Sequence, residues 1–486
     1  MLRPSMSEIE LQRVADYIWE IPAKGGMRVP ARVFASETLL AGIRQDATLR
    51  QLRNTTYLPG IYPYACALPD AHQGYGFPVG GVAAIDAEDG VISPGSIGFD
   101  INCGVRLCRT NLKYDDLHGQ EQQLVNQLFA AVPTGLGVGS IAGTLSADEL
   151  DQVARLGMRW ALERGYATED DLAHCEDEGV RPGADPTCVS PEAKARGRKQ
   201  LGSLGSGNHF LEVQRVAEIF DEQTARQYGL QRDQLVIMIH CGSRGYGHQI
   251  CSDYLKRVAH EHRRLLAELP DRELAAAPVN SPAGQDYYQA MNCAINFAWC
   301  NRQLIMHAAR EVFSTIFGKR WDRLGMTLLY DVAHNIGKRE THLIAGAQRE
   351  VYVHRKGATR AFPAGRAELP PAYRQVGQPV LIPGSMGTGS YVLKGQASSL
   401  ELTFGSTAHG AGRVMSRRQA KRQWQADELQ RELKRQGIYV RGRSKATIAE
   451  EAPGAYKDLD EVVRVSDELG IGARVAKLVP ICNIKG

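Results

Sequence analysis

The sequence predicts an α+β fold, a single large unit over residues 1–486 with β-sheets around a cleft and helices at the periphery. Between residues 60 and 110, short apolar runs alternate with glycines, as in "GYGFPVGGVAAI", which is typical of strands joined by tight turns. Apolar strand patterns that run into glycine-containing loops recur at 235–245, 326–338 and 391–413. No internal repeat and no long linker divides the chain.

Helical periodicity and polar connections account for most of the remaining sequence. The predicted helices are 8–23, 120–131, 147–165, 250–268 and 287–316. The polar segments 174–200, which contains three prolines, and 268–285 are predicted surface loops. Residues 416–436 are predicted to form a strongly basic helix.

Composition narrows the class of protein. Hydrophobic residues make up 43% of the 486, enough for a large core, which argues against a disordered chain. The net charge of +4 permits nucleic acid or phosphate partners without requiring them. The start lacks a signal-peptide core and no run of eighteen apolar residues occurs, so we expect a soluble, cytoplasmic protein. The ten cysteines form no CxxC pair, so a disulfide framework is not expected.

One glycine-rich stretch carries an acid and a thiol on a backbone with unusual conformational freedom. In "SPGSIGFDINCGVR" (93–106), Asp100 and Cys103 lie three residues apart, after glycines that a packed strand would not favour. A thiolate and a carboxylate on such a backbone are candidate metal ligands. Most other cysteines are expected to be small buried residues.

Four of the thirteen histidines share a setting. His209 in "GSGNHFLEVQ", His240 in "IMIHCGSRG", His334 in "DVAHNIG" and His409 in "GSTAHGAG" lie at strand edges or in glycine-flanked loops. Loops at strand ends are where rigid sheets present chemistry. A lone histidine is more often a hydrogen-bonded core or surface residue, but four in one setting, together with the acid and the thiol, favour a common site.

A mixed Asp, Cys and His ligand set suits a divalent transition metal. Imidazole and thiolate favour zinc, cobalt or copper, whereas a carboxylate also suits manganese. The aspartate and the cysteine can serve two adjacent ions with the thiolate bridging them, and such a pair, about 3.5–4 Å apart, would clamp a phosphoryl group. The ligands are distant in sequence, so spacing alone does not establish that they converge.

Further segments indicate phosphate binding. Arg244 in "GSRGYGH" lies next to a candidate ligand, between glycines that let the backbone approach an anion. The loop "PGSMGTGSY" (383–391) can cradle phosphate or ribose, although a simple tight turn explains it equally well. No GxxxxGK[ST] motif occurs, so a nucleotide would not be held by a P-loop. The basic helix is either a solvated face or a track for a polyanion; its cations are Arg417, Arg418, Lys421, Arg422, Arg431, Lys434 and Arg435.

Together these motifs resemble the RtcB family, RNA ligases that join a 3′-phosphate or 2′,3′-cyclic phosphate end to a 5′-hydroxyl. The resemblance covers residues 26 to 486 in the family's order, in "GMRVPARVFAS", "HQGYGFPVGG", "GFDINCGVR", "GSGNHFLEVQ", "HCGSRGYGHQ", "YDVAHN", "PGSMGTGSYVL", "GSTAHGAGR" and the terminal "IKG". Such an array is far more specific than any single glycine motif. The resemblance implies tRNA splicing or RNA repair as the role.

The resemblance also implies a role for each candidate residue. Asp100, Cys103, His209, His240 and His334 would bind two manganese ions, with Cys103 bridging them. His409 would attack the α-phosphate of GTP and carry GMP, and Arg244 would bind RNA phosphate. The implied guanylate pocket comprises Asn208, His209, Phe210, Leu211, Glu212, His334, Asn335, Pro383, Gly384, Ser385, Met386, Ser390, His409, Gly410, Ala411, Gly412 and Lys485.

The residues alone also fit proteins of two other functional classes. The same ligands would suit a two-metal phosphohydrolase or nuclease in which water is the nucleophile and His409 contacts metal or phosphate. A non-enzymatic RNA-binding scaffold that uses the basic helix is a third hypothesis, against which the intact ligand set argues. The sequence leaves open the physiological RNA and the need for an activating partner such as an archease.

Overall fold

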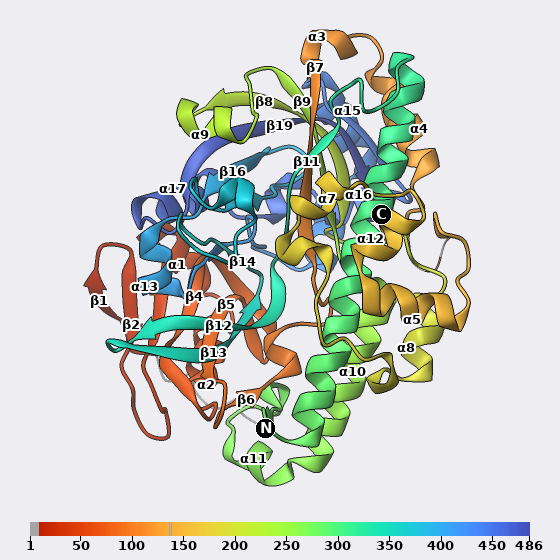
Figure 1. Cartoon of the computed structure of the whole chain (residues 1–486). Helices are drawn as coiled ribbons and strands as arrows, with labels where there is room; N and C mark the ends of the chain where they lie inside the picture. The colour runs from red at the N-terminus through yellow and green to blue at the C-terminus, as the bar shows by residue number, and fades with distance from the viewer. Residues whose placement is uncertain (1–8, 136, 138) are drawn as a thin grey trace.

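Two large β-sheets meet side by side, and a layer of helices covers one flank of the molecule (Figure 1). The computed structural model describes residues 9–135, 137 and 139–486. In Figure 1 the first sheet lies at the lower left and the second at the top, while the long helices run down the right side. Of the helices that the structure describes, none combines the length and the hydropathy that a membrane span requires.

The first sheet has seven strands in the order β1-β2-β3-β4-β5-β13-β12. All neighbours are antiparallel except β3 and β4, which are parallel. Its strands are β1 (Gln12–Ala15), β2 (Ile18–Ile21), β3 (Ala31–Phe34), β4 (Ile61–Tyr75), β5 (Phe77–Asp86), β12 (Asn335–Ile344) and β13 (Ala347–Lys356).

The second sheet follows the order β11-β7-β9-β8-β19-β16-β15, with β18 added in parallel to β19. Its strands are β7 (Gly104–Lys113), β8 (Phe210–Ile219), β9 (Gln234–Cys241), β11 (Thr327–Ala333), β15 (Pro379–Ile382), β16 (Ser390–Lys394), β18 (Tyr439–Gly442) and β19 (Ala473–Lys485). Two short ribbons pair β6 (Val91–Ile92) with β10 (Ala277–Pro278) and β14 (Ala358–Arg360) with β17 (Ser406–Ala408).

The α-helices lie mainly on the flank of the second sheet and around the ends of the first. They are α1 (Glu37–Ile43), α2 (Thr48–Thr55), α3 (Tyr114–Leu117), α4 (Glu121–Ala131), α5 (Ala147–Leu156), α6 (Met158–Glu163), α7 (Glu169–Ala173), α8 (Pro191–Gly197), α9 (Glu222–Gln227), α10 (Arg244–Glu261), α11 (Arg263–Glu268), α12 (Pro282–Phe317), α13 (Ala397–Thr403), α14 (Arg417–Gln423), α15 (Ala426–Arg435), α16 (Lys445–Glu450) and α17 (Leu459–Glu468). Short 3-10 turns occur at 94–96, 176–179, 186–188, 272–274, 371–373 and 453–455.

The longest helix, α12, organises the core. Ser281 caps its first turn by accepting a hydrogen bond from the backbone N–H of Gly284, and Pro282 occupies the first helical position. Gly318 ends it in a left-handed conformation at φ 63°. Its middle turns are buried on all sides, between α10, α4, α5, α6 and β9 (Figure 1).

Most predicted elements are confirmed, including the helix at 120–131 and the buried strand that begins near 235. The predicted opening helix 8–23 is wrong within the described residues, of which residue 8 is not one. Residues 12–21 instead form the β1–β2 hairpin, with Tyr17 turning the chain at φ 60°. β-branched and aromatic side chains in "IWEI" suit a strand, here β2 between β1 and β3, and tertiary pairing outweighs weak helical periodicity.

The predicted helix 147–165 breaks into α5 and α6 at Gly157. This glycine has φ 53°, and a Cβ there would lie 2.3 Å from the carbonyl oxygen of Gly179. The basic segment 416–436 is likewise two helices, α14 and α15, separated by an extended Trp424. The segment 391–413 also includes α13 between its strands.

The two predicted surface loops are more structured than expected. Segment 174–200 contains α8, and the side chain of Glu176 is fully buried. Segment 268–285 contains buried Leu274, contributes β10 to a ribbon and ends in the first turn of α12. In the first segment, polar composition was misleading because Glu176 is buried in an ion pair with Lys338 at 2.8 Å.

The two large sheets meet where the candidate ligands lie. His334 is the single residue between β11 of the second sheet and β12 of the first. Its backbone N–H donates to the carbonyl of Cys103 at 2.8 Å, and Asn102 donates to the carbonyl of Asn335 at 2.7 Å. This crossing fixes the loop before β7 against the β11–β12 junction.

Candidate active site

The strand register gathers five candidate ligands at one end of the second sheet. His240 lies near the end of β9 and pairs with residues of both β7 and β8. His209 directly precedes β8, Cys103 directly precedes β7, and His334 directly follows β11. Asp100 lies in the loop that enters β7. Because β11, β7, β9 and β8 are neighbours, the five side chains converge although they are distant in sequence.

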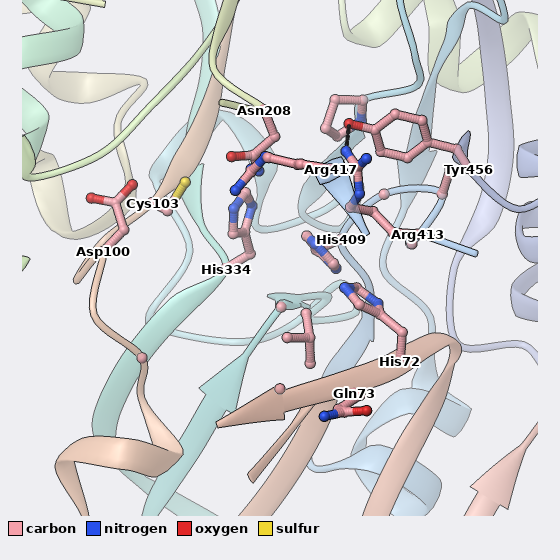
Figure 2. A pocket seen from close by; sticks show the side chains of 18 of the residues that line it. His72, Gln73, Asp100, Cys103, Asn208, His334, His409, Arg413, Arg417 and Tyr456 are labelled. Carbon is pink, nitrogen blue, oxygen red and sulfur yellow. Dashed lines mark hydrogen bonds between the residues drawn. The ribbon is translucent and has the colours of Figure 1, made fainter. Parts of the chain in front are cut away.

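The ligand atoms form two groups that share one thiol. Cys103 Sγ lies 3.4 Å from His209 Nε2 and 3.3 Å from His240 Nε2. His240 Nε2 is 3.2 Å from His334 Nε2, and His209 Nε2 is 2.8 Å from Asp100 Oδ2. Asp100, Cys103 and His209 can hold one ion, and Cys103, His240 and His334 a second. The side chains of Asp100, Cys103 and His334 point toward one another in Figure 2.

Backbone acceptors orient two of the imidazoles. His209 Nδ1 lies 3.1 Å from the carbonyl of Leu204, and His240 Nδ1 lies 3.1 Å from that of Asn208. A carbonyl partner requires that Nδ1 carry the proton, which leaves the lone pair on Nε2 facing the cluster. Burial, with positive neighbours including His409, lowers the pKa of both His240 and His334 well below the usual value. Neutral imidazoles are the form that binds metals.

The thiol and the carboxylate also fit a metal ion. Burial, and then the neighbouring Asp100, raise the pKa of Cys103 to about 12, so its thiolate needs a cation beside it. Burial opposes ionisation of Asp100, yet the hydrogen bond with His209 holds its pKa at about 2. Three imidazoles, one carboxylate and one thiol within contact distance are a donor set that divalent transition metals accept.

A buried arginine ties the ligand-bearing segments together. Arg302 of α12 is fully buried and makes a bidentate ion pair with Asp331 of β11. Its Nη1 donates to the carbonyls of Asn102 and Cys241, at 2.7 Å each, and its Nη2 donates to the side-chain oxygen of Asn102. These partners are adjacent in sequence to the candidate ligands Cys103 and His240, so one guanidinium positions three ligand-bearing elements.

His409 faces the cluster from the other side of the cavity. It directly follows β17, and its ring centroid lies 4.9 Å from that of His334. Its Nδ1 is 2.6 Å from Asp70 Oδ2, a close contact that is not aligned as a hydrogen bond, and its backbone N–H donates to the same oxygen at 2.9 Å. Burial opposes ionisation of Asp70, but His409 lowers its pKa below the usual value. Because Nδ1 contacts Asp70, Nε2 is the ring nitrogen available to a ligand in the cavity.

A cavity of about 720 Å³ joins these groups. Figure 2 shows Asp100 and Cys103 at one side, Arg413 and Tyr456 at the other, with His334 and His409 between them. The predicted site residues that line the cavity are Asp100, Cys103, Asn208, Phe210, His240, His334, Asn335, Pro383, Gly384, His409, Gly410, Ala411, Gly412 and Lys485. Those outside its lining are His209, Leu211, Glu212, Arg244, Ser385, Met386 and Ser390.

A buried polar network adjoins the cavity behind Lys485. Glu212 accepts hydrogen bonds from Gln214, at 2.6 Å, and from Asn483. Gln214 also donates to Ser390 Oγ at 2.9 Å, and Ser390 Oγ accepts from the backbone of Gly384 at 3.2 Å. The network therefore connects β8, β19 and the 383–390 loop, which the sequence alone could not place together.

The charged groups in this network are buried. Burial raises the pKa of Glu212 to about 7 despite Lys485, and burial lowers the pKa of Lys485. The Lys485 ammonium lies 4.8 Å from the centroid of the Phe210 ring. Ionisable groups next to a cavity whose charged forms are disfavoured by burial are typical of a binding site.

Two residues of the implied pocket point elsewhere. Leu211 alternates with its neighbours along β8, and its side chain is buried in the core beneath the helices. Met386 is fully buried in a small cluster with Leu429 and Leu433 of α15. Their side chains pack the walls that support the site and do not line the cavity.

Arg244 lies beside the first ligand group. Its Nη1 is 3.0 Å from His209 Nδ1, but that nitrogen already faces the carbonyl of Leu204 and cannot accept while it carries a proton. Its Nε has no partner among the described residues. A guanidinium with spare donors next to the cluster suits an anion.

The basic segment reaches the cavity only at its start. Arg417 lines the cavity and its Nε lies 3.2 Å from Glu451, and Lys421 pairs with Glu450 at 3.1 Å. The apolar side chains of α15 are turned inward, including Leu429. The cations of α15, Arg431, Lys434 and Arg435, remain exposed on its outer face, so a polyanion track over both helices stays a prediction.

Sequence reasoning missed several residues that hold the site. Asp70, which contacts His409, lies two positions before the quoted motif "HQGYGFPVGG". Arg413 and Tyr456 line the cavity and are hydrogen-bonded to each other at 3.1 Å. Arg302 lies in the middle of a helix, where its charge resembled an ordinary polar position. Only the pairing of distant segments reveals these contacts.

Fold and site together define a mixed helix-and-sheet protein with a buried His, Cys and Asp cluster that can hold metal, facing a further histidine across one cavity.

Comparison with known proteins identifies the family. The family described as tRNA-splicing ligase RtcB matches residues 51–486. The chain is 53% identical over 480 residues to the tRNA-splicing ligase RtcB of Thermococcus kodakarensis, which covers 98% of this chain and 99% of that protein. It is 51% identical to the proteins of the same name from Pyrobaculum aerophilum and Archaeoglobus fulgidus, covering 99% and 98% of this chain and 100% and 99% of theirs. The chain belongs to the RtcB family.

Proposed function

We propose that this protein is a GTP-dependent RNA ligase that joins RNA 3′-phosphate or 2′,3′-cyclic phosphate ends to 5′-hydroxyl ends. The observation that carries the proposal is the position of His409, which lines the same cavity as Cys103, the thiol common to both possible metal groups. A nucleophile beside a paired metal site is the arrangement that phosphoryl or nucleotidyl transfer requires. Membership of a family of tRNA-splicing ligases supports the choice of RNA as substrate.

Two manganese ions are the proposed cofactors. Asp100, Cys103 and His209 would hold one and Cys103, His240 and His334 the other, with the Cys103 thiolate bridging them. When bound, the ions would neutralise phosphate charge and orient the reacting oxygens. The protein's own part is to keep His240 and His334 neutral by burial, and to direct the Nε2 atoms of His209 and His240 inward through the carbonyl contacts at Nδ1.

GTP is the proposed co-substrate. Lys485, Asn208, Phe210 and the loop from Pro383 line the cavity on the His409 side, where a nucleotide would lie. Glu212, ionised, would accept hydrogen bonds from the N1–H and 2-amino group of guanine, which adenine lacks. This requires a movement of Gln214 or Asn483, since both now donate to Glu212.

The chemistry proceeds in three displacements. His409 Nε2 forms a bond to the α-phosphorus of GTP while the bond to the β-phosphate oxygen breaks and pyrophosphate leaves. An oxygen of the RNA 3′-phosphate then attacks the GMP phosphorus and releases the histidine. Finally the 5′-hydroxyl attacks the 3′-phosphorus, loses its proton and displaces GMP; a 2′,3′-cyclic end first needs hydrolysis to the 3′-phosphate.

The proposed cellular role is tRNA splicing or the repair of cleaved RNA in the cytoplasm, with an archease-like activator as a possible partner protein. Mass spectrometry after incubation with GTP and Mn²⁺ tests the chemistry. We expect a covalent GMP on His409 that is labile in acid and stable in base. Release of phosphate from RNA ends with no covalent adduct would instead indicate a two-metal phosphohydrolase.

A further inference from the structure

Three aromatic rings form an exposed cluster at the rim of the cavity. Phe99 stacks on His248 of α10, with centroids 4.9 Å apart and planes at 28°, and meets Tyr75 edge-on at 5.4 Å and 70°. Tyr75 is 38% exposed, and the side chain of His248 is also open to solvent. Phe99 lines the cavity and directly precedes the candidate ligand Asp100. We call Tyr75, Phe99 and His248 the aromatic rim.

The aromatic rim is built on a fixed backbone. The ammonium of Lys356 is buried and donates to the carbonyls of Tyr75, Phe77 and Gly95, at 2.7, 3.1 and 2.9 Å. Glu273 accepts a hydrogen bond from the backbone of Gly76 at 2.7 Å. The tip of the β4–β5 hairpin and the loop that carries Phe99 are thus held together before any ligand binds, which lowers the entropic cost of binding.

The aromatic rim lies on the side of the cavity that holds the candidate metal ligands, away from His409. Figure 2 places Asp100 and Cys103 at the opposite end of the cavity from Arg413 and Tyr456, with His409 between them. In the proposed last step the attacking 5′-hydroxyl and the departing guanylate lie roughly in line through the phosphorus. If the guanylate occupies the His409 side, the strand with the 5′-hydroxyl approaches from the side of the aromatic rim.

We propose that the aromatic rim stacks a base near the leading end of the RNA strand that carries the 5′-hydroxyl. The inference rests on the proposed ligase function and names a subsite for one of its two RNA substrates. Exposed aromatic rings beside a groove are the common platform for unpaired bases, and they bind with little sequence preference because every base has a flat π-face.

The charges around the aromatic rim indicate stacking rather than ionic attraction. Burial and the nearby Arg196 lower the pKa of His248, so its ring is neutral at pH 7. Burial, and then Glu273 at the other end of the cluster, raise the pKa of the Tyr75 phenol. Cations and anions both lie around the rings, among them Lys356 and Asp100, so neither sign of charge dominates and base stacking supplies the specific contact.

Single-turnover sealing tests the subsite. An RNA with a pre-formed 3′-guanylylated end is sealed to a 5′-hydroxyl strand by wild type, by the double variant Tyr75→Leu/His248→Leu and by Phe220→Leu. Phe220 is a matched control, because it is 37% exposed and stacks on Tyr391 but does not line the cavity. Each protein is assayed with an intact strand and with strands that lack a base at one of the first three positions.

We expect the double variant to seal the intact strand about tenfold more slowly, and the control to match wild type. One abasic position in the 5′-hydroxyl strand should slow wild type to the same degree but slow the double variant no further, because both changes remove one contact. Equal rates for wild type and double variant would overturn the inference, as would a loss seen only with abasic sites in the 3′-phosphate strand. Absence of sealing by wild type would instead contradict the proposed function.

Discussion

The two ends of the cavity are built in different ways. At the end proposed to bind metal, here the metal end, the candidate ligands Asp100, Cys103, His209, His240 and His334 flank strands of one sheet whose register brings them together. At the end proposed to bind the nucleotide, here the nucleotide end, His409, Glu212, Lys485 and the 383–390 loop come from the end of a short ribbon, a strand, the last strand and a loop.

The contacts that support the two ends of the cavity also differ. Behind the metal end, the fully buried Arg302 and Arg106 both pair with Asp331 and fix the backbone around the ligands. At the nucleotide end, burial raises the pKa of Glu212 to about 7 and lowers that of Lys485, so burial disfavours both charges. The metal end is therefore set by the core of the fold, whereas the nucleotide end holds charged groups that burial disfavours.

The substitution His409→Ala separates the two ends most sharply. It removes the proposed nucleophile. Of the groups in contact with the candidate metal ligands, it removes only the His409 ring, which meets the ring of His334 edge-on. We expect no covalent GMP, measured by mass spectrometry after GTP and Mn²⁺, together with wild-type manganese content. The variant should still seal RNA that has a pre-formed 3′-guanylylated end, because that step does not use the histidine. Protein-bound GMP in this variant would place the nucleophile elsewhere.

The substitution Cys103→Ser tests the metal end. Because both ligand groups include this thiol, its loss should weaken both sites at once, and manganese per chain measured by atomic spectroscopy should fall at both. The protein should still fold, since a serine is close in size. Normal manganese content with normal ligation would exclude a bridging role for Cys103.

Sequence reasoning identified the candidate ligands of the metal end better than the residues that hold them in place. All five candidate ligands, which the structure brings together, were named from motifs, since glycine-flanked His, Cys and Asp residues at strand ends are conspicuous. Arg302 and Glu176 were not, because an arginine in a helix and a glutamate in a polar segment resemble surface residues until their partners are known. The opening hairpin was predicted as a helix for a related reason, since pairing of β1 with β2 outweighs local periodicity.

The nucleotide end was less readable from sequence. The resemblance listed Leu211 and Met386 beside Glu212, but only strand alternation and loop packing determine which side chains face the cavity. Asp70, the contact of His409, lies 339 residues away in the chain, and no spacing rule connects the two. Single motifs identify chemistry, whereas the contacts that orient it depend on tertiary structure.

The substitution Arg302→Met tests whether the core sets the metal end. Removing one partner of a buried ion pair destabilises a protein by about 3 kcal/mol, here moderated because Asp331 keeps Arg106. It also frees the carbonyls next to Cys103 and His240, so we expect manganese affinity to fall about tenfold or more. Denaturant unfolding and metal titration measure the two effects.

Arg310→Met is the matched control for that variant. Arg310 lies on the same helix, is 2% exposed and forms a bidentate ion pair with buried Asp171, but contacts no ligand-bearing loop. It should destabilise the protein by a similar amount while leaving manganese affinity unchanged. If both variants lose metal equally, the effect reflects general instability and not positioning by Arg302.

The smallest predicted effect concerns the pH dependence of Glu212 at the nucleotide end. Burial raises its pKa from the ordinary 4.5 to about 7, so between these values the folded protein binds a proton that the unfolded chain does not. The free energy of unfolding of wild type therefore falls as pH rises from 4.5 to 7, by up to about 3 kcal/mol. Glu212→Gln lacks this loss, so it should gain stability relative to wild type across that interval, as measured by urea unfolding at pH 4.5 and 8.

Glu340→Gln, in the first sheet, should behave in the opposite way. Arg355, through its ion pair, and His342 hold the pKa of Glu340 well below the usual value despite burial, so its contribution to stability is present at neutral pH and lost in strong acid. That variant should be less stable than wild type at pH 8, whereas Glu212→Gln should be more stable while losing its preference for GTP over ATP. If Glu212→Gln instead destabilises the protein at pH 8, the carboxylate is satisfied without a ligand, and the contrast between the two ends of the cavity fails at this residue.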